Sequence, residues 1–378
     1  MHDVLIAGAG PAGAIAALVL ARAGVRVTVF DRATFPRDKL CGDTLNPGAL
    51  TILRRLGIAH VAQGGLPIDG MIVTGEPNVR VEARYGAAIV GRAMTRRVLD
   101  VALLEAAAHA GAQITEGVVI RGPIVEETGG ERRVCGLEVV APHGNVAHVR
   151  AGLVIAADGA HSRIARALRL ARNSPRPRRW AVGAYFENVA DLSSCGEMHV
   201  RRGHYIGVAP LPGGITNVCV VTAALASLNR PGDLLAARLA NDPQLAQRFA
   251  TARMMSTPVV MGPLAVDCIV PGTRGLLLAG DAAGFIDPMT GDGLRFALRG
   301  AELAAAEALH TLQHGNSDAH WRLQLARQRE FRRKWRFNRS LRALVGAPLA
   351  VRTAASAAEL APVWLRHAIR YAGDLRAS

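Results

Sequence analysis

The segment VLIAGAGPAG, residues 4–13, decides the fold expected of this 378-residue chain. A short apolar strand from Val4 to Ala7 must turn sharply into a helix, and Gly8 permits the backbone angles of that turn. Gly10 carries no side chain, so a pyrophosphate can approach the backbone, and Gly13 lets the helix lie close against the strand. The segment therefore predicts a strand–turn–helix unit that binds a dinucleotide.

The residues after the glycine turn support this prediction. A helix that begins at Pro11-Ala12 directs its free N–H groups and the positive end of its dipole at the phosphates. The next apolar strand ends at Asp31, where an acidic residue is expected to accept hydrogen bonds from the adenosine ribose. Asp31 disfavours a 2′-phosphate, although Arg32 beside it weakens that argument. The uncharged run would also suit a membrane helix or signal peptide, but its proline and three glycines disfavour both.

The composition indicates a large globular protein of a reducing compartment. The length exceeds that of one typical domain, so two packed units are expected, and half of the residues are apolar. Five cysteines without a Cys-x-x-Cys pair disfavour a disulfide framework or a metal site: Cys41, Cys135, Cys195, Cys219 and Cys268. We therefore expect a cytoplasmic protein without a metal. The net charge is +15, but the chain has two lysines against 43 arginines, so charge alone does not indicate a polyanionic partner.

Two further stretches have the same form as the first. Residues 154–162 (VIAADGAHS) place Asp158-Gly159 after an apolar strand, and residues 276–284 (LLLAGDAAG) place Gly280-Asp281 after another. The last stretch continues to a Gly-Asp-Gly sequence at 291–293. A single glycine fingerprint is weak evidence for a site, but three apolar strands that end in Gly or Asp in this order indicate one shared site.

Together these motifs resemble those of single-component FAD oxidoreductases with the p-hydroxybenzoate hydroxylase fold. Residues 35–42 (FPRDKLCG), 96–100 (RRVLD) and 280–288 (GDAAGFIDP) are most similar to the geranylgeranyl-reductase branch, and the resemblance covers about residues 1–310. It implies an α/β fold with three parts. These are a Rossmann-like, GR2-type FAD-binding domain (1–170 with 269–315), a β-sheet substrate domain (171–268, with a contribution from about 67–92) and a helical C-terminal segment (316–378).

The resemblance also implies which residues bind a non-covalent FAD: Gly8, Gly10, Pro11, Ala12, Gly13, Asp31, Arg32, Cys41, Gly42, Arg96, Asp158, Gly159, Gly280, Asp281, Pro288, Gly291, Gly293 and Leu294. Asp281 would bond the ribityl hydroxyls, with a helix N-cap as the alternative. The 158–159 pair would back the pyrophosphate, while His161 or Ser162 caps the next helix. Arg96 would reach the phosphate or ribityl side, unless it is a solvated arginine. The helix that opens at 291–294 would stabilise the reduced flavin edge.

The reaction is less determined than the cofactor. By resemblance, Cys41 lies at the mouth of the substrate cavity, where a thiol tunes the flavin, donates a proton or contacts substrate, although a small buried hydrophobe is the equal alternative. His204 and Tyr205 are candidates for acid–base chemistry, with outward-facing strand residues as the alternative. Geranylgeranyl reductases carry a Y-x-W-x-F-P run, and here Gly207 and Ala209 replace its Trp and Phe. That replacement suggests extra room near this strand.

We therefore expect a monooxygenase (hydroxylase) that acts on a hydrophobic aromatic or polyketide-like molecule with reduced FAD and oxygen, and with NAD(P)H as the electron donor. The first alternative is a carbon–carbon double-bond reductase of an isoprenoid or other lipophilic substrate. The second is an electron-transfer flavoprotein without a small-molecule substrate. The W-x-W-x-I-P segment of flavin halogenases is absent from the sequence, which disfavours halogenation.

The C-terminal segment is strongly basic. Between Trp321 and Arg342 it contains nine arginine or lysine residues and one acid, Glu330, with interleaved apolar residues at Phe331, Trp335, Phe337 and Leu341. Such a helix packs its aromatic residues on the FAD domain, or lies on an anionic membrane surface. Nucleic acid is disfavoured because no binding motif accompanies the charge. We expect packing first, and peripheral membrane contact as the alternative.

Overall fold

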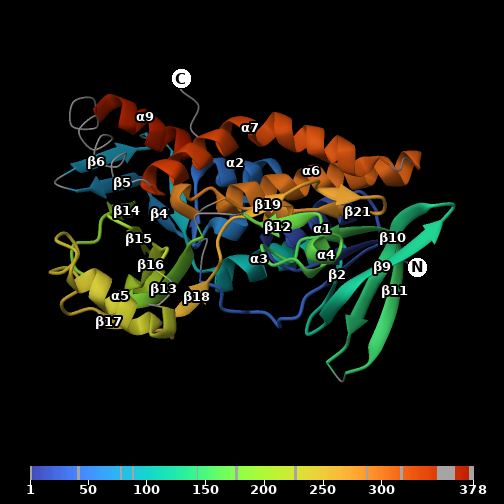
Figure 1. The fold of residues 1–378 in the computed structure, drawn as a ribbon, viewed down its shortest axis with the longest axis horizontal. Helices are drawn as coiled ribbons and strands as arrows, with labels where there is room; N and C mark the ends of the chain where they lie inside the picture. The colour runs from blue at the N-terminus through green and yellow to red at the C-terminus, as the bar shows by residue number, and fades with distance from the viewer. Residues whose placement is uncertain are drawn as a thin grey trace.

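The structure is a computed structural model that describes residues 2–40, 43–76, 79–86, 89–142, 144–174, 178–224, 228–286, 288–315, 318–346 and 362–373. Two of the predicted site residues, Cys41 and Gly42, lie outside the described residues. Figure 1 shows a helix-covered sheet, a second sheet beside it, and two C-terminal helices along one edge of the molecule.

The first sheet carries the three sequence motifs. Its strands follow the order β20 (Gly272–Thr273), β21 (Leu276–Leu278), β11 (Val146–Ala156), β1 (His2–Ala7), β2 (Val27–Phe30) and β8 (Gln113–Thr115). β1 pairs in parallel with β11 and β2, and β11 pairs in parallel with β21. The three strands that end in Gly or Asp motifs are therefore neighbours. Their carboxyl ends meet at one edge, where ligands bind in open parallel sheets.

Both faces of this sheet are covered. On one face Val4, Ile6 and Val29 pack against α1 (Pro11–Arg22), α3 (Arg96–His109) and α6 (Gly293–His314). On the other face Leu5 and Val154 pack against α4 (Arg163–Ala167) and the long hairpin of β9 (Val119–Thr128) and β10 (Glu131–Val140). Because both faces are buried, the strands read as continuous apolar runs.

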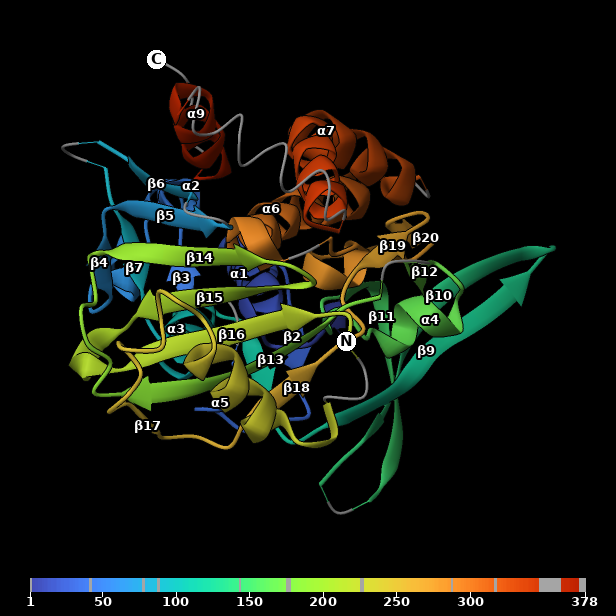
Figure 2. The same cartoon turned by 60° about the vertical axis from the view of Figure 1, so that its left-hand side comes forward.

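The second sheet has the order β17 (Arg253–Met254), β13 (Trp180–Glu187), β16 (Thr216–Thr222), β15 (His204–Pro210), β14 (Cys195–Arg201), β5 (Gly70–Gly75) and β6 (Val79–Arg84), and β18 (Val259–Met261) pairs with β13. β5 joins β14 in parallel, so residues from the N-terminal half complete this sheet. α5 (Pro231–Ala240) covers one face through Leu234, Leu235 and Leu239. The opposite face turns toward the first sheet and its helices (Figure 2).

Smaller elements connect the two sheets. β3 (Thr44–Leu45), β7 (Gly91–Ala93) and β4 (Leu66–Ile68) form a three-stranded sheet, and β12 (Ala171–Asn173) pairs with β19 (Val266–Cys268). α2 (Pro47–Arg55) and the short helices η1 (Ala59–Ala62), η2 (Pro212–Gly214), η4 (Gly280–Ala283) and η5 (Pro288–Thr290) complete the described elements of this region.

The C-terminal segment forms two helices that pack on the rest of the molecule. α7 (Ala319–Gly346) runs along α6, and α9 (Pro362–Ala372) lies against β6. Both helices lie on the side of the molecule away from α5 in the two views (Figure 1, Figure 2). Within the described residues, no helix has the length and apolar character needed to span a membrane.

Candidate functional site

The glycine turn is sterically determined. Gly8 has φ +97°, and an added Cβ there would lie 2.5 Å from the Ala157 carbonyl oxygen of the neighbouring strand β11. A Cβ on Gly13 would overlap the Gly8 carbonyl oxygen, so only glycine lets α1 lie this close to β1. A Cβ on Gly10 would point at the Arg37 guanidinium, 3.4 Å away. Gly10 therefore faces a guanidinium group that would bind a phosphate.

Two arginines face this space and share one carboxylate. Arg96 is 5% exposed and donates to both Asp100 oxygens at 2.7 and 2.8 Å. The Arg37 guanidinium lies 3.0 Å from the same carboxylate. Two cations against one anion leave a net positive charge beside Gly10, as a pyrophosphate requires. Arg96 is thus buried at the site and is not a solvated arginine. Sequence reasoning missed Arg37, although it stands in the FPRDKLCG segment.

Asp31 closes the adenosine side of the turn. Its carboxylate accepts hydrogen bonds from the backbone N–H of Ala9 at 2.7 Å and of Ala33 at 2.8 Å. Arg32 beside it is exposed. The carboxylate therefore holds the glycine turn in place from the end of β2, which is where the sequence places the ribose-binding acid.

The Asp158-Gly159 motif forms the loop between β11 and α4. Ser162 caps α4 by accepting from the Ala165 N–H at 3.0 Å, as one of the two sequence alternatives has it. Asp158 Oδ2 accepts from the Arg163 N–H at 2.9 Å, while its buried Oδ1 has no partner among the described residues. Burial raises the pKa of Asp158 above its usual value. The loop lies directly behind Gly8 and so backs the phosphate position.

Asp281 is a partly exposed carboxylate without a hydrogen-bond partner among the described residues. It lies in η4, whose N-cap residue is Ala279, so the Asp281 side chain does not cap that helix. Burial raises the pKa of Asp281, and the positive charges of Lys39 and Arg96 oppose the rise. A partly desolvated carboxylate gains from hydrogen-bond donors, so Asp281 is disposed to accept hydrogen bonds from a bound molecule.

The Gly-Asp-Gly loop is fixed by side chains from the N-cap of α2 and from α7. Asp292 is 1% exposed and accepts from Asn46 at 3.1 Å and from Lys334 of α7 at 3.1 Å. The same ammonium donates to the carbonyl oxygens of Tyr371 and Ala372 at the end of α9, at 2.5 and 2.9 Å. Lys334 therefore links the C-terminal helices to this loop. Sequence reasoning missed the link, although Lys334 is one of only two lysines in an arginine-rich chain.

The other predicted residues of this region lie around the same loop. Gly291 has φ +64°, Gly293 begins α6, and Leu294 is 4% exposed in the core. Pro288 begins η5. The backbone N–H groups at the start of α6 have no side-chain cap from Asp292, so they remain available to an electron-rich ligand edge.

The inner face of the second sheet is apolar, and it leaves room above Gly207. Cross-strand register places Gly183, Cys219, Gly207 and Met198 in one row. The nearest atom to a Cβ on Gly207 is 3.9 Å away, whereas Leu40 fills the space above Gly183. The space above Gly207 is where the sequence suggested extra room.

Tyr205 and His204 lie on opposite faces of β15. Tyr205 is 3% exposed and packs on the inner face with Met289 and Leu341. His204 lies on the outer face, and burial first and then Arg238 lower its pKa. Of the three predicted catalytic residues, Tyr205 lies on the inner face and His204 on the outer face. Cys41 is outside the described residues.

Asp43, just before β3, is hydrogen-bonded both to the start of α3 and to the second sheet. It is 4% exposed, and its carboxylate accepts from the Tyr185 hydroxyl at 3.0 Å, the Asn217 amide and the Arg96 N–H at 3.1 Å. Burial raises the pKa of Asp43 to about 6, although these three hydrogen bonds oppose the rise. Sequence reasoning missed Asp43, and the available signal was an acid directly after the Cys41-Gly42 pair.

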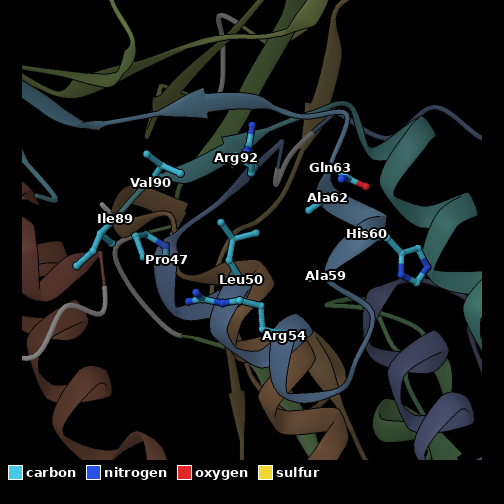
Figure 3. A pocket seen from close by; sticks show the side chains of 10 residues that line it. All are labelled: Pro47, Leu50, Arg54, Ala59, His60, Ala62, Gln63, Ile89, Val90 and Arg92. Atoms are coloured by element: carbon cyan, nitrogen blue, oxygen red, sulfur yellow. The ribbon is translucent and has the colours of Figure 1, made fainter. Parts of the chain in front are cut away.

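Two cavities lie away from these residues. One cavity, of about 440 Å³, lies between α2, η1 and β7. In Figure 3, Leu50 lies below Val90 and Ala62, and the His60 ring points away from them. The other, of about 350 Å³, lies beside Glu197 and Arg248. None of the predicted site residues lines either cavity. Across the described ranges, no cluster of three or more His, Cys, Asp or Glu side chains is placed to hold a metal ion.

The geometry agrees with a known family. Residues 1–330 match the family described as FAD binding domain. The chain belongs to this family of flavoproteins. It is an FAD-dependent oxidoreductase, and the resemblance to the p-hydroxybenzoate hydroxylase fold with a geranylgeranyl-reductase-like branch is confirmed.

Curated relatives of this flavoprotein carry reductase names. It is 31% identical over 333 residues to the menaquinone reductase of Mycobacterium tuberculosis, which covers 80% of this chain and 75% of that protein. It is 30% identical over 332 residues to digeranylgeranylglycerophospholipid reductase 1 of Methanopyrus kandleri, covering 84% and 83%. A third relative, conditioned medium factor receptor 1 of Dictyostelium discoideum, is 27% identical over 341 residues, and the match spans only 62% of its length.

Solved structures of several flavoproteins share the fold. A flavin-dependent brominase superposes with a TM-score of 0.82 at 19% identity, covering 98% of this chain and 93% of that one. A geranylgeranyl bacteriochlorophyll reductase-like protein from Thermoplasma acidophilum gives 0.79 at 22% identity, covering 91% and 87%. These identities are low, so the likeness concerns the fold alone.

The residues present fit FAD. Gly10 faces the guanidinium groups of Arg37 and Arg96, and the buried Nε of Arg37 has no partner among the described residues. The buried Asp158 Oδ1 atom and the partly exposed Asp281 carboxylate are likewise acceptors that the described residues leave without a donor. A dinucleotide with a polyhydroxylated chain supplies both the phosphates and the donors that these groups lack.

Proposed function

We propose that this flavoprotein reduces a carbon–carbon double bond of a lipophilic, isoprenoid-like substrate. The observation that carries the proposal is the Asp43–Tyr185–Asn217 cluster, a buried proton-carrying group beside an apolar sheet face. The reductase names of relatives at 30–31% identity support the same choice. This places reduction ahead of hydroxylation, which the sequence alone put first.

The inner sheet face supplies the binding surface for such a substrate. Met198, Tyr205 and Val221 present apolar surface there, and Gly207 leaves room for a branched chain. Leu341 from α7 packs against this apolar cluster. Removing an alkene chain from water onto this surface is favourable by about 25 cal/mol per Å² of apolar area.

The reaction needs a hydride at one carbon and a proton at the other. FAD, when bound and reduced, supplies the hydride. Asp43 holds the proton at its carboxyl group, and Tyr185, which donates to that group at 3.0 Å, offers a route for the proton through its hydroxyl. With a pKa of about 6, Asp43 populates both protonation states near neutral pH, which suits a general acid that must be recharged in each cycle.

The residues around the cofactor position have holding roles. Arg37 and Arg96 would hold the phosphates, and Asp281 would hold the ribityl hydroxyls. We propose NAD(P)H as the electron donor, either directly or through a partner protein, and the sequence shows no second nucleotide fingerprint.

Product mass tests this proposal. The purified FAD-loaded protein is incubated with NADPH, NADH or dithionite and a geranylgeranyl lipid or a menaquinone, with and without oxygen. A gain of two hydrogen atoms that does not depend on oxygen is expected. A gain of one oxygen atom, seen only in air, would replace reduction by hydroxylation. Turnover with an artificial acceptor but with no lipid in the panel would favour an electron-transfer protein.

A further inference from the structure

The basic C-terminal segment has two chemically different faces. Of its nine basic residues, four are used in packing: Arg322 pairs with Glu307, Arg327 donates to the Ala283 carbonyl oxygen at 2.7 Å, Lys334 binds Asp292, and the Arg342 carbonyl oxygen accepts from Arg179 at 3.0 Å. Phe331, 1% exposed, packs edge-on to Phe296 of α6. The aromatic residues therefore serve the packing that the sequence led us to expect.

The other five basic residues point outward. Arg329, Arg332, Arg333, Arg336 and Arg339 are exposed and recur at intervals of three or four, so they occupy one stripe of α7. Within the described residues, Arg339 is the one of these five that forms an ion pair, a 3.7 Å contact with Asp267. The single acid of the segment, Glu330, faces inward and binds Arg295 and Arg299 at 3.1 Å. The outward stripe thus carries positive charge without an acid of its own helix.

Exposed apolar residues continue the same stripe. Trp321 and Leu325 are 52% and 53% exposed, one turn apart near the start of α7. α9 adds an exposed Val363 (57%) together with exposed Arg366 and Arg370. The two helices lie on the same side of the molecule, away from α5 (Figure 1, Figure 2). From Trp321 to Arg339 the stripe extends about 27 Å along the helix axis at 1.5 Å per residue.

From this arrangement we propose that the outward face of α7, together with α9, docks the protein on an anionic lipid bilayer. Arginines in a row attract acidic headgroups, and a tryptophan beside them lies at the depth of the headgroup region. A nucleic acid would use the same arginines but would give no role to an exposed Leu325 and Val363. α7 has its docking stripe on the outward side, and its Leu341 packs against the inner sheet face. A bilayer bound to α7 would therefore lie next to the proposed lipid site.

Vesicle binding tests the proposal directly. The FAD-loaded protein is mixed with vesicles of phosphatidylcholine alone or of phosphatidylcholine with phosphatidylglycerol, and bound protein is measured by sedimentation. Binding to the anionic vesicles is expected at low salt. It should be lost at about 1 M salt, where the Debye length falls to about 3 Å. No binding to anionic vesicles at low salt would overturn the proposal.

Two triple variants locate the binding face. Arg332→Gln/Arg333→Gln/Arg336→Gln should weaken binding about a hundredfold, because one basic residue near an anionic surface contributes about a fivefold factor. Arg132→Gln/Arg202→Gln/Arg230→Gln removes the same charge from exposed positions on β10, the β14–β15 turn and the segment before α5, and should bind like the native protein. Equal weakening in both variants would mean that net charge, and not this face, drives binding.

Two further arms separate lipid insertion from general polyanion binding. Vesicles with brominated acyl chains should quench the native protein's tryptophan emission, and Trp321→Phe should remove most of that quenching. A DNA duplex that binds at the vesicle-binding salt concentration, with the same hundredfold loss in the α7 variant, would overturn the lipid assignment. Reduction of a detergent-dispersed lipid by the α7 variant should equal that of the native protein. Vesicle binding and the proposed reaction can therefore fail independently.

Discussion

Replacing Asp43 by asparagine tests the central residue of the proposed reaction. The side chain keeps its shape, and its oxygen still accepts from the Arg96 N–H. Its new amide can donate to the Tyr185 oxygen, and the Asn217 amide can turn to accept. Asp43→Asn should therefore fold and retain FAD while losing the titrating proton.

The magnitude of the effect on stability follows from the pKa of Asp43. Burial raises that pKa from 3.8 to about 6, so the native state holds a proton that the unfolded chain has released. A raised carboxyl pKa contributes stability at low pH, and that contribution is lost as the pH rises through the native pKa. The total is about 3 kcal/mol, at 1.36 kcal/mol per pKa unit. Because pH 5 lies one unit below about 6, roughly 1.4 kcal/mol of it is lost between pH 5 and pH 8.

Urea unfolding at several pH values measures this directly. The free energy of unfolding of the native protein should fall by about 1.4 kcal/mol from pH 5 to pH 8 relative to that of Asp43→Asn. Asp233→Asn, at an exposed position of α5, serves as the control and should track the native protein. In turnover, Asp43→Asn should lower kcat on the order of a hundredfold and remove a pH dependence centred near 6. A constant stability difference across this range would refute the raised pKa, and an unchanged kcat would refute the proton-donor role.

Three other substitutions test the rest of the site. Asp281→Ala removes a charged hydrogen-bond acceptor worth about 1.5–3 kcal/mol, so FAD affinity, measured by flavin fluorescence, should fall tenfold to a hundredfold; unchanged affinity would contradict the ribityl role. Lys334→Met leaves the buried Asp292 carboxylate without its ammonium partner, so limited proteolysis should cleave the C-terminal segment faster. Arg332→Met, which changes an exposed arginine of the same helix, is the control. Equal cleavage of the two variants would show that Lys334 does not hold the segment. Gly207→Leu fills the room above Gly207 on the inner face, so KM for the lipid should rise while FAD affinity stays the same. An unchanged KM would mean that the lipid binds elsewhere.

The sequence by itself determined the FAD-binding fold. Gly8 has φ +97°, and a Cβ on Gly13 would overlap the Gly8 carbonyl oxygen, so the turn itself requires both glycines. Each of the three motifs follows directly on a buried strand, so its chemistry can be read from adjacent residues. Cys41 stays a prediction because it lies outside the described residues. The NAD(P)H donor and the membrane contact also stay proposals.

Only the tertiary structure decided which residues come into contact when they are far apart in the sequence. The Asp43 carboxylate contacts Tyr185 and Asn217, which follow it by 142 and 174 residues in the sequence. These contacts depend on how the second sheet packs against the first. Strand alternation shows that His204 and Tyr205 face opposite ways, but not which of them faces inward. The side that α5 covers settles that, because its leucines bury the outer face and leave Tyr205 to the inner one. Helical periodicity likewise groups the arginines of α7, whereas packing against α6 decides which of them remain in solvent.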